Sequence, residues 1–273
     1  MRLRTGPVPL PAAALTMTGG EGGQDAFAIE LTGAGKAFGG LAVLSGIDVS
    51  LPRGSRTGIV GPSGGGKTTL LQIIAGLLDA DTGLVRVEGA TAAPQRLAHC
   101  ALMPQRDLLL PWRTALDNAA IALENRGAGR AEARRLTLPL FEQFGLSGFE
   151  RARPLQLSGG MRQRVSFLRT LMAGKDVLLL DEPFGALDSI TRAQLQEWLR
   201  QAMDAVPRTV LLVTHDVEEA LLLCGRVIVL SQRPGRVVTM LRGGGGFTGS
   251  RRQIVTSPEF VSLKEQALAA IGP

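Results

Sequence analysis

Residues 61 to 68 have the types and spacing that bind a phosphate chain. They read, in order, Gly61, Pro62, Ser63, Gly64, Gly65, Gly66, Lys67 and Thr68. This is the pattern of a glycine, four residues, then glycine, lysine and serine or threonine. The glycines let the backbone curl so that successive amides point at an anion, and a helix start adds the positive end of its dipole. Lys67 can then reach the β- and γ-phosphates of a nucleotide, and the Thr68 hydroxyl can ligate Mg²⁺.

The segments on either side of this loop are those that the motif requires. Residues 56–60 predict a short buried strand, and residues 68–75 have apolar side chains at helical spacing. Gly76 stands where a helix would end. A glycine-rich turn could match the motif by accident, but the order of strand, loop and helix favours binding of nucleotide phosphate.

Two carboxylates follow another apolar run at residues 177–180. At the carboxyl end of a strand, Asp181 can hold Mg²⁺ through water, as enzymes with such a phosphate loop require of a second acidic position. Glu182, the next residue, can polarise the attacking water as a general base. A solvated acidic turn is the plainer alternative, and the nearby phosphate motif argues against it.

A second anion site is predicted where Ser158, Gly159 and Gly160 precede a helix. Two glycines after a serine expose backbone amides at the helix start. The buried face of this helix is predicted to consist of Met161, Val165, Leu168 and Met172. A single γ-phosphate needs only one phosphate-binding helix start, so the presence of a second one has to be explained.

These motifs resemble those of ATP-binding cassette (ABC) ATPases over nearly all of residues 28–240. In that family two cassettes pair head to tail, and the Leu-Ser-Gly-Gly segment of one closes over ATP held by the phosphate loop of the other. The resemblance implies that Ser158 and Gly160 contact the γ-phosphate in trans. It also implies an α/β fold, in which a P-loop NTPase core has a largely parallel sheet, an antiparallel β edge and an inserted helical subdomain.

The resemblance gives roles to isolated residues as well. Phe38 would stack on adenine, and Gln105 would sense Mg²⁺ and water. His215 would contact the γ-phosphate as the switch histidine, and Asp188, after Ala186 and Leu187, would couple the two sites. Taken alone, Phe38 would more often be a core residue, His215 a loop histidine and Asp188 a helix N-cap.

The family therefore implies ATP and Mg²⁺ as cofactors and three sets of residues. The catalytic set is Lys67, Gln105, Glu182 and His215. The ATP-binding set is Phe38, Gly61, Pro62, Ser63, Gly64, Gly65, Gly66, Lys67, Thr68, Thr69, Ser158, Gly160 and Asp188. The Mg²⁺ set is Thr68, Gln105 and Asp181.

Alternating and apolar runs give the expected organisation of the chain. An edge strand is predicted at residues 28–31, and further strands at 47–51, 84–87, 177–180, 210–213 and 227–230. Helices are predicted at residues 116–125, 131–144, 191–206 and 259–271, with Pro139 expected to kink or split the second. The expected domains are a disordered extension over 1–26, an ABC ATPase domain over 27–242 and a flexible link with a C-terminal helix over 243–273. The helical subdomain is expected at about 95–165.

Composition excludes several classes. The chain of 273 residues carries a net charge of +6, which invites a nucleic-acid interpretation, but aromatic residues make up 4% and tyrosine is absent. Without base-stacking residues, nucleic-acid binding is not expected. Cys100 and Cys224 are expected to be reduced core residues. No apolar run reaches the ~18 residues that a membrane span needs, so the chain is expected to be soluble by itself.

Two functional classes remain open. The first is the ATPase subunit of a membrane transporter, and the second is a soluble ABC ATPase acting on nucleic acid or ribosomes. The second class usually has two fused cassettes, a coiled-coil insertion or zinc-binding cysteines, which this chain lacks. The apolar run from Leu108 to Trp112 is typical of a partner site, although its residues could also pack the helical subdomain.

Residues 105–112 and 181–188 resemble bacterial import cassettes for nitrate, sulfonates, taurine and pyrimidine precursors. That resemblance implies integral-membrane permease subunits as partners and, through them, a substrate-binding protein. It also implies a homodimer or another paired cassette, bound peripherally at the cytoplasmic face of the inner cell membrane.

Overall fold

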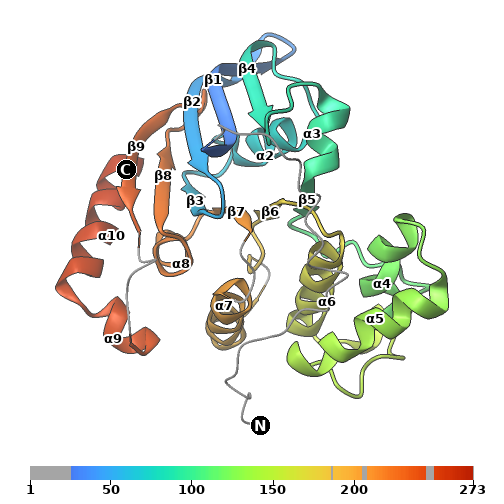
Figure 1. Cartoon of the computed structure of the whole chain (residues 1–273). Coiled ribbons are helices and arrows are strands. Elements are labelled where there is room, and N and C mark those ends of the chain that lie inside the picture. The colour runs from blue at the N-terminus through green and yellow to red at the C-terminus, as the bar shows by residue number, and fades with distance from the viewer. Residues whose placement is uncertain (1–25, 186, 205–207, 244–248, 273) are drawn as a thin grey trace. The chain divides into compact units, whose positions relative to one another are not determined.

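The computed structural model describes residues 26–185, 187–204, 208–243 and 249–272 (Figure 1). The described residues group into two compact units. The helical unit lies within Met103–Asp176 and Pro183–Val206, and the sheet unit lies within Glu21–Leu102, Val177–Glu182 and Pro207–Pro273. The extension predicted over 1–26, apart from residue 26, lies outside the described residues, as do residues 244–248 of the predicted link.

One sheet of the sheet unit is antiparallel, with strand order β2-β1-β4. Its strands are β1 (Phe27–Phe38), β2 (Leu41–Pro52) and β4 (Thr82–Val87). The prediction of an edge strand near residue 28 was wrong, because β1 lies in the centre. Leu31 pairs with Val49 on one side and with Val85 on the other. The alternating pattern reports burial of one face, and burial of one face does not distinguish a central strand from an edge.

The other sheet has the strand order β5-β6-β7-β3-β8-β9. Its strands are β3 (Arg56–Val60), β5 (Cys100–Met103), β6 (Val177–Asp181), β7 (Thr209–Thr214), β8 (Arg226–Leu230) and β9 (Val237–Arg242). The central strands β6, β7, β3 and β8 pair in parallel, whereas β9 pairs antiparallel with β8. Strands β6 and β7 are buried along their whole length, as expected for a parallel sheet covered on both faces. The predicted α/β core with an antiparallel β edge is confirmed.

Five helices are described in the sheet unit. They are α2 (Lys67–Ala75), α3 (Ala93–His99), α8 (Val217–Leu223), α9 (Arg251–Val255) and α10 (Pro258–Ile271). Helix α2 ends at Gly76, as predicted, with the left-handed backbone that a glycine adopts without strain. Apolar side chains of α2 belong to the same buried cluster as residues of both sheets, so the helix joins the two sheets into one core. Cys100 and Cys224 are buried thiols outside any disulfide, as expected.

The predicted C-terminal helix is confirmed as α10, which packs against α8 and β9 (Figure 1). Phe260 of α10 is fully buried. On α8, the Glu218 carboxylate pairs with Arg251 at 2.6 Å and with Lys264 at 3.2 Å. The two C-terminal helices are thus tied to α8 by both apolar packing and charge.

The helical unit contains four α-helices among its described residues. They are α4 (Ala115–Asn125), α5 (Arg130–Gln143), α6 (Gly159–Met172) and α7 (Ser189–Asp204), with a short 3₁₀ turn η1 (Pro154–Gln156) before α6. Its core includes the rings of Phe144, Phe167 and Trp198, whose centroids lie 5.0 to 6.2 Å apart. Of the two effects expected of Pro139, a kink or a split, the split does not occur, because helix α5 continues through the proline. Leu140 and Phe141, just after the proline, are buried, and this packing favours continuation of the helix.

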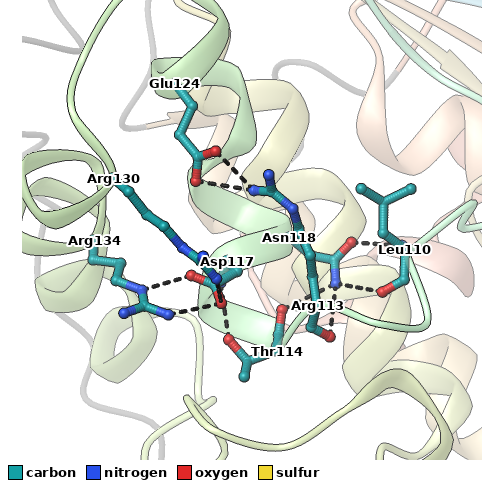
Figure 2. Close-up of polar contacts among 8 residues, drawn as sticks. All are labelled: Leu110, Arg113, Thr114, Asp117, Asn118, Glu124, Arg130 and Arg134. Carbon is teal, nitrogen blue, oxygen red and sulfur yellow. Dashed lines mark hydrogen bonds and ion pairs between the residues drawn. The ribbon is translucent and has the colours of Figure 1, made fainter.

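A polar network fixes the start of α4 (Figure 2). The buried carboxylate of Asp117 accepts hydrogen bonds from Arg134 at 2.6 and 2.9 Å and from Arg130 at 3.0 Å. The neighbouring Asn118 donates to the carbonyl of Leu110 and accepts from the amide of Leu110 at 2.7 Å. Since one side chain satisfies both backbone groups of Leu110, the loop before α4 is anchored to the helix.

Candidate nucleotide-binding and hydrolysis site

The phosphate-binding loop joins the carboxyl end of β3 to the start of α2. Gly64 and Gly66 have φ angles of 77° and 89°, which side chains with a Cβ rarely adopt. Gly66 is the N-cap residue of α2, and no side chain caps this helix start. The first amides of a helix have no acceptor within the helix, so the loop offers uncapped donors together with the positive end of the helix dipole. This donor set fits a chain of phosphate groups.

Lys67 lies inside the curl of this loop. Its Nζ donates to the carbonyls of Gly61 and Pro62, at 2.9 Å each, and the side chain is buried. Burial lowers the pKa of Lys67, and the nearby carboxylates Glu182 and Asp181 oppose that shift. The ammonium group is therefore held at the loop, close to where phosphate oxygens would develop charge.

Thr68 and Asp181 meet at the carboxyl ends of β3 and β6. The Thr68 hydroxyl donates to Oδ1 of Asp181 at 3.3 Å. Burial raises the pKa of Asp181, while the hydrogen bond from Thr68 opposes the rise. One hydroxyl and one carboxylate fit Mg²⁺, which takes one or two oxygen ligands from a protein and others from substrate phosphates and water.

Glu182 and His215 follow two neighbouring strands, β6 and β7. The amide of Glu182 donates to the carbonyl of Val213 at 2.8 Å, which continues the β6–β7 pairing beyond Asp181. The Nδ1 atom of His215 lies 3.2 Å from Oε2 of Glu182. Glu182 also has a φ of 43°, a left-handed backbone that is costly for a residue with a side chain. Backbone strain of this kind tends to collect at functional sites.

The phosphate loop, Asp181, Glu182 and His215 thus lie at the carboxyl ends of three adjacent parallel strands in the order β6-β7-β3 (Figure 1). In open α/β sheets, ligands bind at this edge. The arrangement places the amide-lined loop, a hydroxyl–carboxylate pair that fits Mg²⁺ and the Glu182 carboxylate at one edge of the sheet. Such a site can activate water for attack on a terminal phosphate.

Phe38 stands at the end of β1, with 49% of its surface exposed. The Nζ of Lys36 lies 5.5 Å from the centre of its ring, and Lys36 also pairs with Asp81 at 2.6 Å. This exposure rules out a core role for Phe38 and leaves part of its ring accessible for stacking.

The remaining predicted residues lie in the helical unit. Ser158 is the N-cap of α6, where its Oγ accepts from the amide of Met161 at 3.2 Å. Gly160 packs closely against α7, because an added Cβ would lie 3.0 Å from Cγ2 of Thr191. Asp188 caps α7 by accepting from the amide of Thr191 at 3.0 Å, and this hydrogen bond lowers the pKa of the Asp188 carboxyl.

Gln105 lies beside the start of α6 in a pocket of about 600 Å³. The lining residues are Gln105, Arg106, Asp107, Leu108, Gly159, Arg162, Gln163, Gly185 and Leu187. The structure therefore brings together, within the helical unit, the glutamine segment, the Ser158 helix start and the loop before Asp188. These three segments lie far apart in the sequence, and only the family resemblance predicted that they act together.

One neighbour of the phosphate loop was not predicted. The Nε of Arg233, in the turn between β8 and β9, donates to the carbonyl of Gly64 at 3.4 Å. The sequence signal for this turn is the Arg-Pro-Gly triplet at residues 233–235.

Comparison with known proteins agrees with this site. The family described as "ABC transporter" matches residues 44–185. The taurine import ATP-binding protein TauB of Rhizobium johnstonii is 44% identical over 218 residues, which cover 78% of this chain and 82% of that protein. The aliphatic sulfonates import ATP-binding protein SsuB 1 of Rhodococcus jostii is 45% identical over 205 residues, which cover 75% and 80%.

The fold is also shared with a solved structure. The dimeric structure of MJ0796, a bacterial ABC transporter cassette, superposes with a TM-score of 0.70 at 29% identity, over 80% of this chain and all of that one. None of the described helices is both long enough and apolar enough to cross a bilayer. The match to the family extends from β2 to the residues just after Glu182 and includes the phosphate loop. The chain therefore belongs to the ABC transporter family of ATP-hydrolysing cassettes.

Proposed function

We propose that this chain is the ATP-hydrolysing motor subunit of a bacterial ABC importer for a small organic or inorganic ion. One observation carries the hydrolytic part of the proposal: His215 contacts Glu182 at 3.2 Å beside the Thr68–Asp181 pair. The import role is supported by similarity to proteins named for taurine and aliphatic sulfonate import. A soluble ABC ATPase acting on nucleic acid or ribosomes is not favoured by these relatives.

Each residue of the sheet-unit site has a role in hydrolysis. The uncapped amides of Gly66 to Thr69 and the ammonium of Lys67 bind the β- and γ-phosphates, and Phe38 stacks on the adenine. Glu182 accepts a proton from the attacking water as general base, and His215 orients the Glu182 carboxylate. Thr68 and Asp181 would hold Mg²⁺, which would neutralise charge on the phosphate oxygens.

The second half of the ATP site comes from a paired cassette. Ser158 and Gly160 of one copy contact the γ-phosphate held by the other, and Asp188 couples the two sites. The exposure of Ser158 supports this role, because its hydroxyl can reach a ligand while its Oγ still caps α6. The dimeric arrangement of the MJ0796 cassette supports pairing of two copies.

The segment from Leu108 to Trp112 binds the permease. The side chains of Leu108 and Trp112 are 60% and 70% exposed, which is unusual for large apolar groups. The backbone below them is held firmly, since Arg169 of α6 donates to the carbonyls of Asp107 and Leu108 at 2.6 and 2.8 Å. A rigid loop that presents apolar side chains suits a cytoplasmic helix of an integral-membrane permease. The subunit then lies peripherally at the cytoplasmic face of the cell membrane.

The transported ion belongs to the sulfonate, taurine, nitrate or pyrimidine-precursor type. A substrate-binding protein and the permease select the ion, and the cassette dimer supplies only the energy. Closure of the dimer around ATP drives the permease from one state to the other. Loss of the γ-phosphate contacts after hydrolysis lets the dimer reopen.

Affinity purification of tagged Glu182→Gln protein from detergent-solubilised membranes, in the presence of ATP, tests the importer role. The substitution removes the general base, so the closed complex should persist during purification. Recovery of a stoichiometric multi-span membrane protein supports the proposal. Recovery of ribosomal proteins or nucleic acid instead would contradict the importer role and leave the ATPase chemistry standing. Wild-type protein purified without ATP is the control.

A further inference from the structure

The turn from Ser231 to Arg236, between β8 and β9, is closed by hydrogen bonds between its first and last residues. The amide of Ser231 donates to the carbonyl of Arg236 at 3.0 Å, and the amide of Arg236 donates to Oγ of Ser231 at 3.0 Å. The same hydroxyl lies 2.8 Å from the carbonyl oxygen of Gln232 and 3.0 Å from that of Pro234, and its single proton is donated to one of them. One serine therefore closes both ends of the turn, and Arg233 projects from it.

This turn lies directly against the phosphate-binding loop. Besides the hydrogen bond from Arg233 to Gly64, the backbones approach so closely that only glycines fit. A Cβ added to Gly235 would lie 2.2 Å from the carbonyl oxygen of Gly65, and one added to Gly65 would lie 2.9 Å from the carbonyl oxygen of Ser231. Gly235 also exchanges hydrogen bonds of 2.8 and 3.1 Å with Val43 and Ser45 of β2, which anchors the turn on its other side.

The contact from Arg233 fixes one peptide group of the loop. The carbonyl of Gly64 accepts from Arg233, and the amide of Gly65, in the same peptide plane, donates to the carbonyl of Pro62 at 3.1 Å. The C=O and N–H of a trans peptide point in opposite directions, so this group is held from both sides. The carbonyl of Pro62 also accepts from Nζ of Lys67 at 2.9 Å. A continuous chain of hydrogen bonds therefore runs from Arg233 to Lys67.

We propose that Arg233 is a positioning residue for ATP binding, which holds the Gly64–Gly65 peptide of the phosphate loop in the curl that receives the nucleotide. The inference rests on the proposed function, in which this loop binds ATP. Three consecutive glycines give the free loop many accessible conformations. Affinity falls in proportion to the fraction of molecules in which the loop is ready to bind, so a contact that selects one conformation raises affinity.

Calorimetric titration of the full chain with ATP and with ADP tests this role. In Arg233→Ala, both affinities should fall by about five- to tenfold, the effect of losing one hydrogen bond from a charged donor. The kcat at saturating ATP should be unchanged, because Arg233 touches no reacting atom. Arg236→Ala is the matched control: it removes the same charge from the same turn without touching the loop, and it should bind both nucleotides as the wild type does.

Two further variants separate positioning from charge and from folding. Gly235→Ala leaves Arg233 in place but pushes against the backbone of Gly65. It should weaken binding of ATP and ADP alike, measured at a temperature where the variant is still folded, since relief of the clash also lowers its melting temperature. Arg233→Lys keeps the charge but loses the planar Nε donor, and it should recover only part of the affinity. If Arg233→Lys has wild-type nucleotide affinity at low salt and loses it at high salt, the positioning role is wrong and the effect of Arg233 is one of charge.

Unchanged nucleotide affinity in Arg233→Ala, or an equal loss in Arg236→Ala, would also overturn the inference. The variant Lys67→Ala distinguishes a wrong role for Arg233 from a wrong proposed function. If Lys67→Ala loses ATP binding while Arg233→Ala does not, only the role of Arg233 is wrong. If Lys67→Ala also binds ATP normally, the loop is not the ATP site.

Discussion

The Nδ1 atom of His215 lies 3.2 Å from Oε2 of Glu182, in the segments that follow two neighbouring parallel strands. Glu182 is the less exposed of the two side chains, and His215 is about half exposed. The histidine can therefore orient the carboxylate with one nitrogen while its ring remains accessible to a ligand. Two residues that are far apart in the chain thus act as one unit because β6 and β7 pair directly.

Glu182→Gln should retain ATP binding and lose hydrolysis. The amide has nearly the shape of the carboxylate but cannot accept the proton of the attacking water, and loss of a general base costs about 10²- to 10⁴-fold in kcat. Phosphate release and ATP titration on the same preparation measure the two effects. Wild-type turnover in the variant would remove Glu182 from the role of base.

Mixed dimers should reveal that each ATP site is shared between two copies. Lys67→Ala disables the phosphate loop, and Ser158→Arg blocks the segment that reaches across, so each variant alone should be inactive. When the two are mixed, half of the sites in a mixed dimer contain an intact loop and an intact serine. Partial recovery of hydrolysis on mixing, measured by phosphate release, is the expected result. If the mixture stays as inactive as its components, Ser158 does not act in trans.

Trp112→Ala should impair association with a permease and leave the isolated subunit unaffected. The side chain is mostly exposed, so its removal costs little packing energy, while an exposed aromatic anchor can supply about 2 kcal/mol at a protein interface. The measurement is recovery of the permease with the tagged subunit. Leu155→Ala, which removes another exposed apolar side chain of the helical unit, is the control. Normal recovery with Trp112→Ala would place the permease elsewhere.

Asp117→Asn should destabilise the helical unit by about 2 kcal/mol at neutral pH, because a buried carboxylate loses charge-assisted hydrogen bonds to partly exposed arginines. Hydrogen bonding to Arg134, with Arg130 adding to it, holds the pKa of Asp117 well below its usual value. The folded pKa is lowered, so this stabilisation is present above the ordinary carboxyl pKa of about 3.9 and is lost as pH falls below it. The difference between wild type and variant should therefore shrink in acid.

Tryptophan fluorescence during urea unfolding can measure this effect, since the two tryptophans of the chain, Trp112 and Trp198, both lie in the helical unit. Glu132→Gln is the control, because it breaks an exposed arginine pair on α5 and should not change the midpoint. A difference between wild type and Asp117→Asn that stays constant from pH 7 down to pH 3 would show that the variant acts through packing and not through charge.

Phe260→Ala should destabilise the sheet unit by about 3 to 5 kcal/mol, the usual cost of removing a fully buried phenylalanine. Because α10 packs on α8, and α8 begins two residues after His215, the variant should also lower kcat. Circular dichroism melting and phosphate release give the two readouts. Val261→Ala, on the exposed side of the same helix, is the control and should change neither the melting temperature nor kcat. Equal melting temperatures for the two variants would mean that α10 does not stabilise the sheet unit.

Local patterns predicted the elements that carry the phosphate chemistry. Strand β3 has the predicted bounds, and α2 ends at the predicted glycine, because short-range backbone preferences determine both. The contact between Glu182 and His215 could not be predicted in this way. It depends on the strand order β6-β7-β3, which is set by packing of the whole sheet.

Errors arose where tertiary packing outweighs local preference. Strand β1 was assigned to an edge although it pairs on both sides, and α5 continues through Pro139 on the strength of its buried face. Strand β9 was missed, and with it the contact of Arg233 on the phosphate loop. A turn that approaches a loop from a distant part of the chain leaves no periodic signal at the loop itself.

Glu182 keeps its side chain at a backbone angle that a glycine would adopt freely. Relief of that left-handed conformation would favour the folded chain by about 1 kcal/mol, so Glu182→Gly is expected to gain stability from the backbone while it loses hydrolysis. Thermal stability and turnover therefore oppose each other at this single position. The left-handed backbone at residue 182 is thus a cost in stability at the position where we propose the general base.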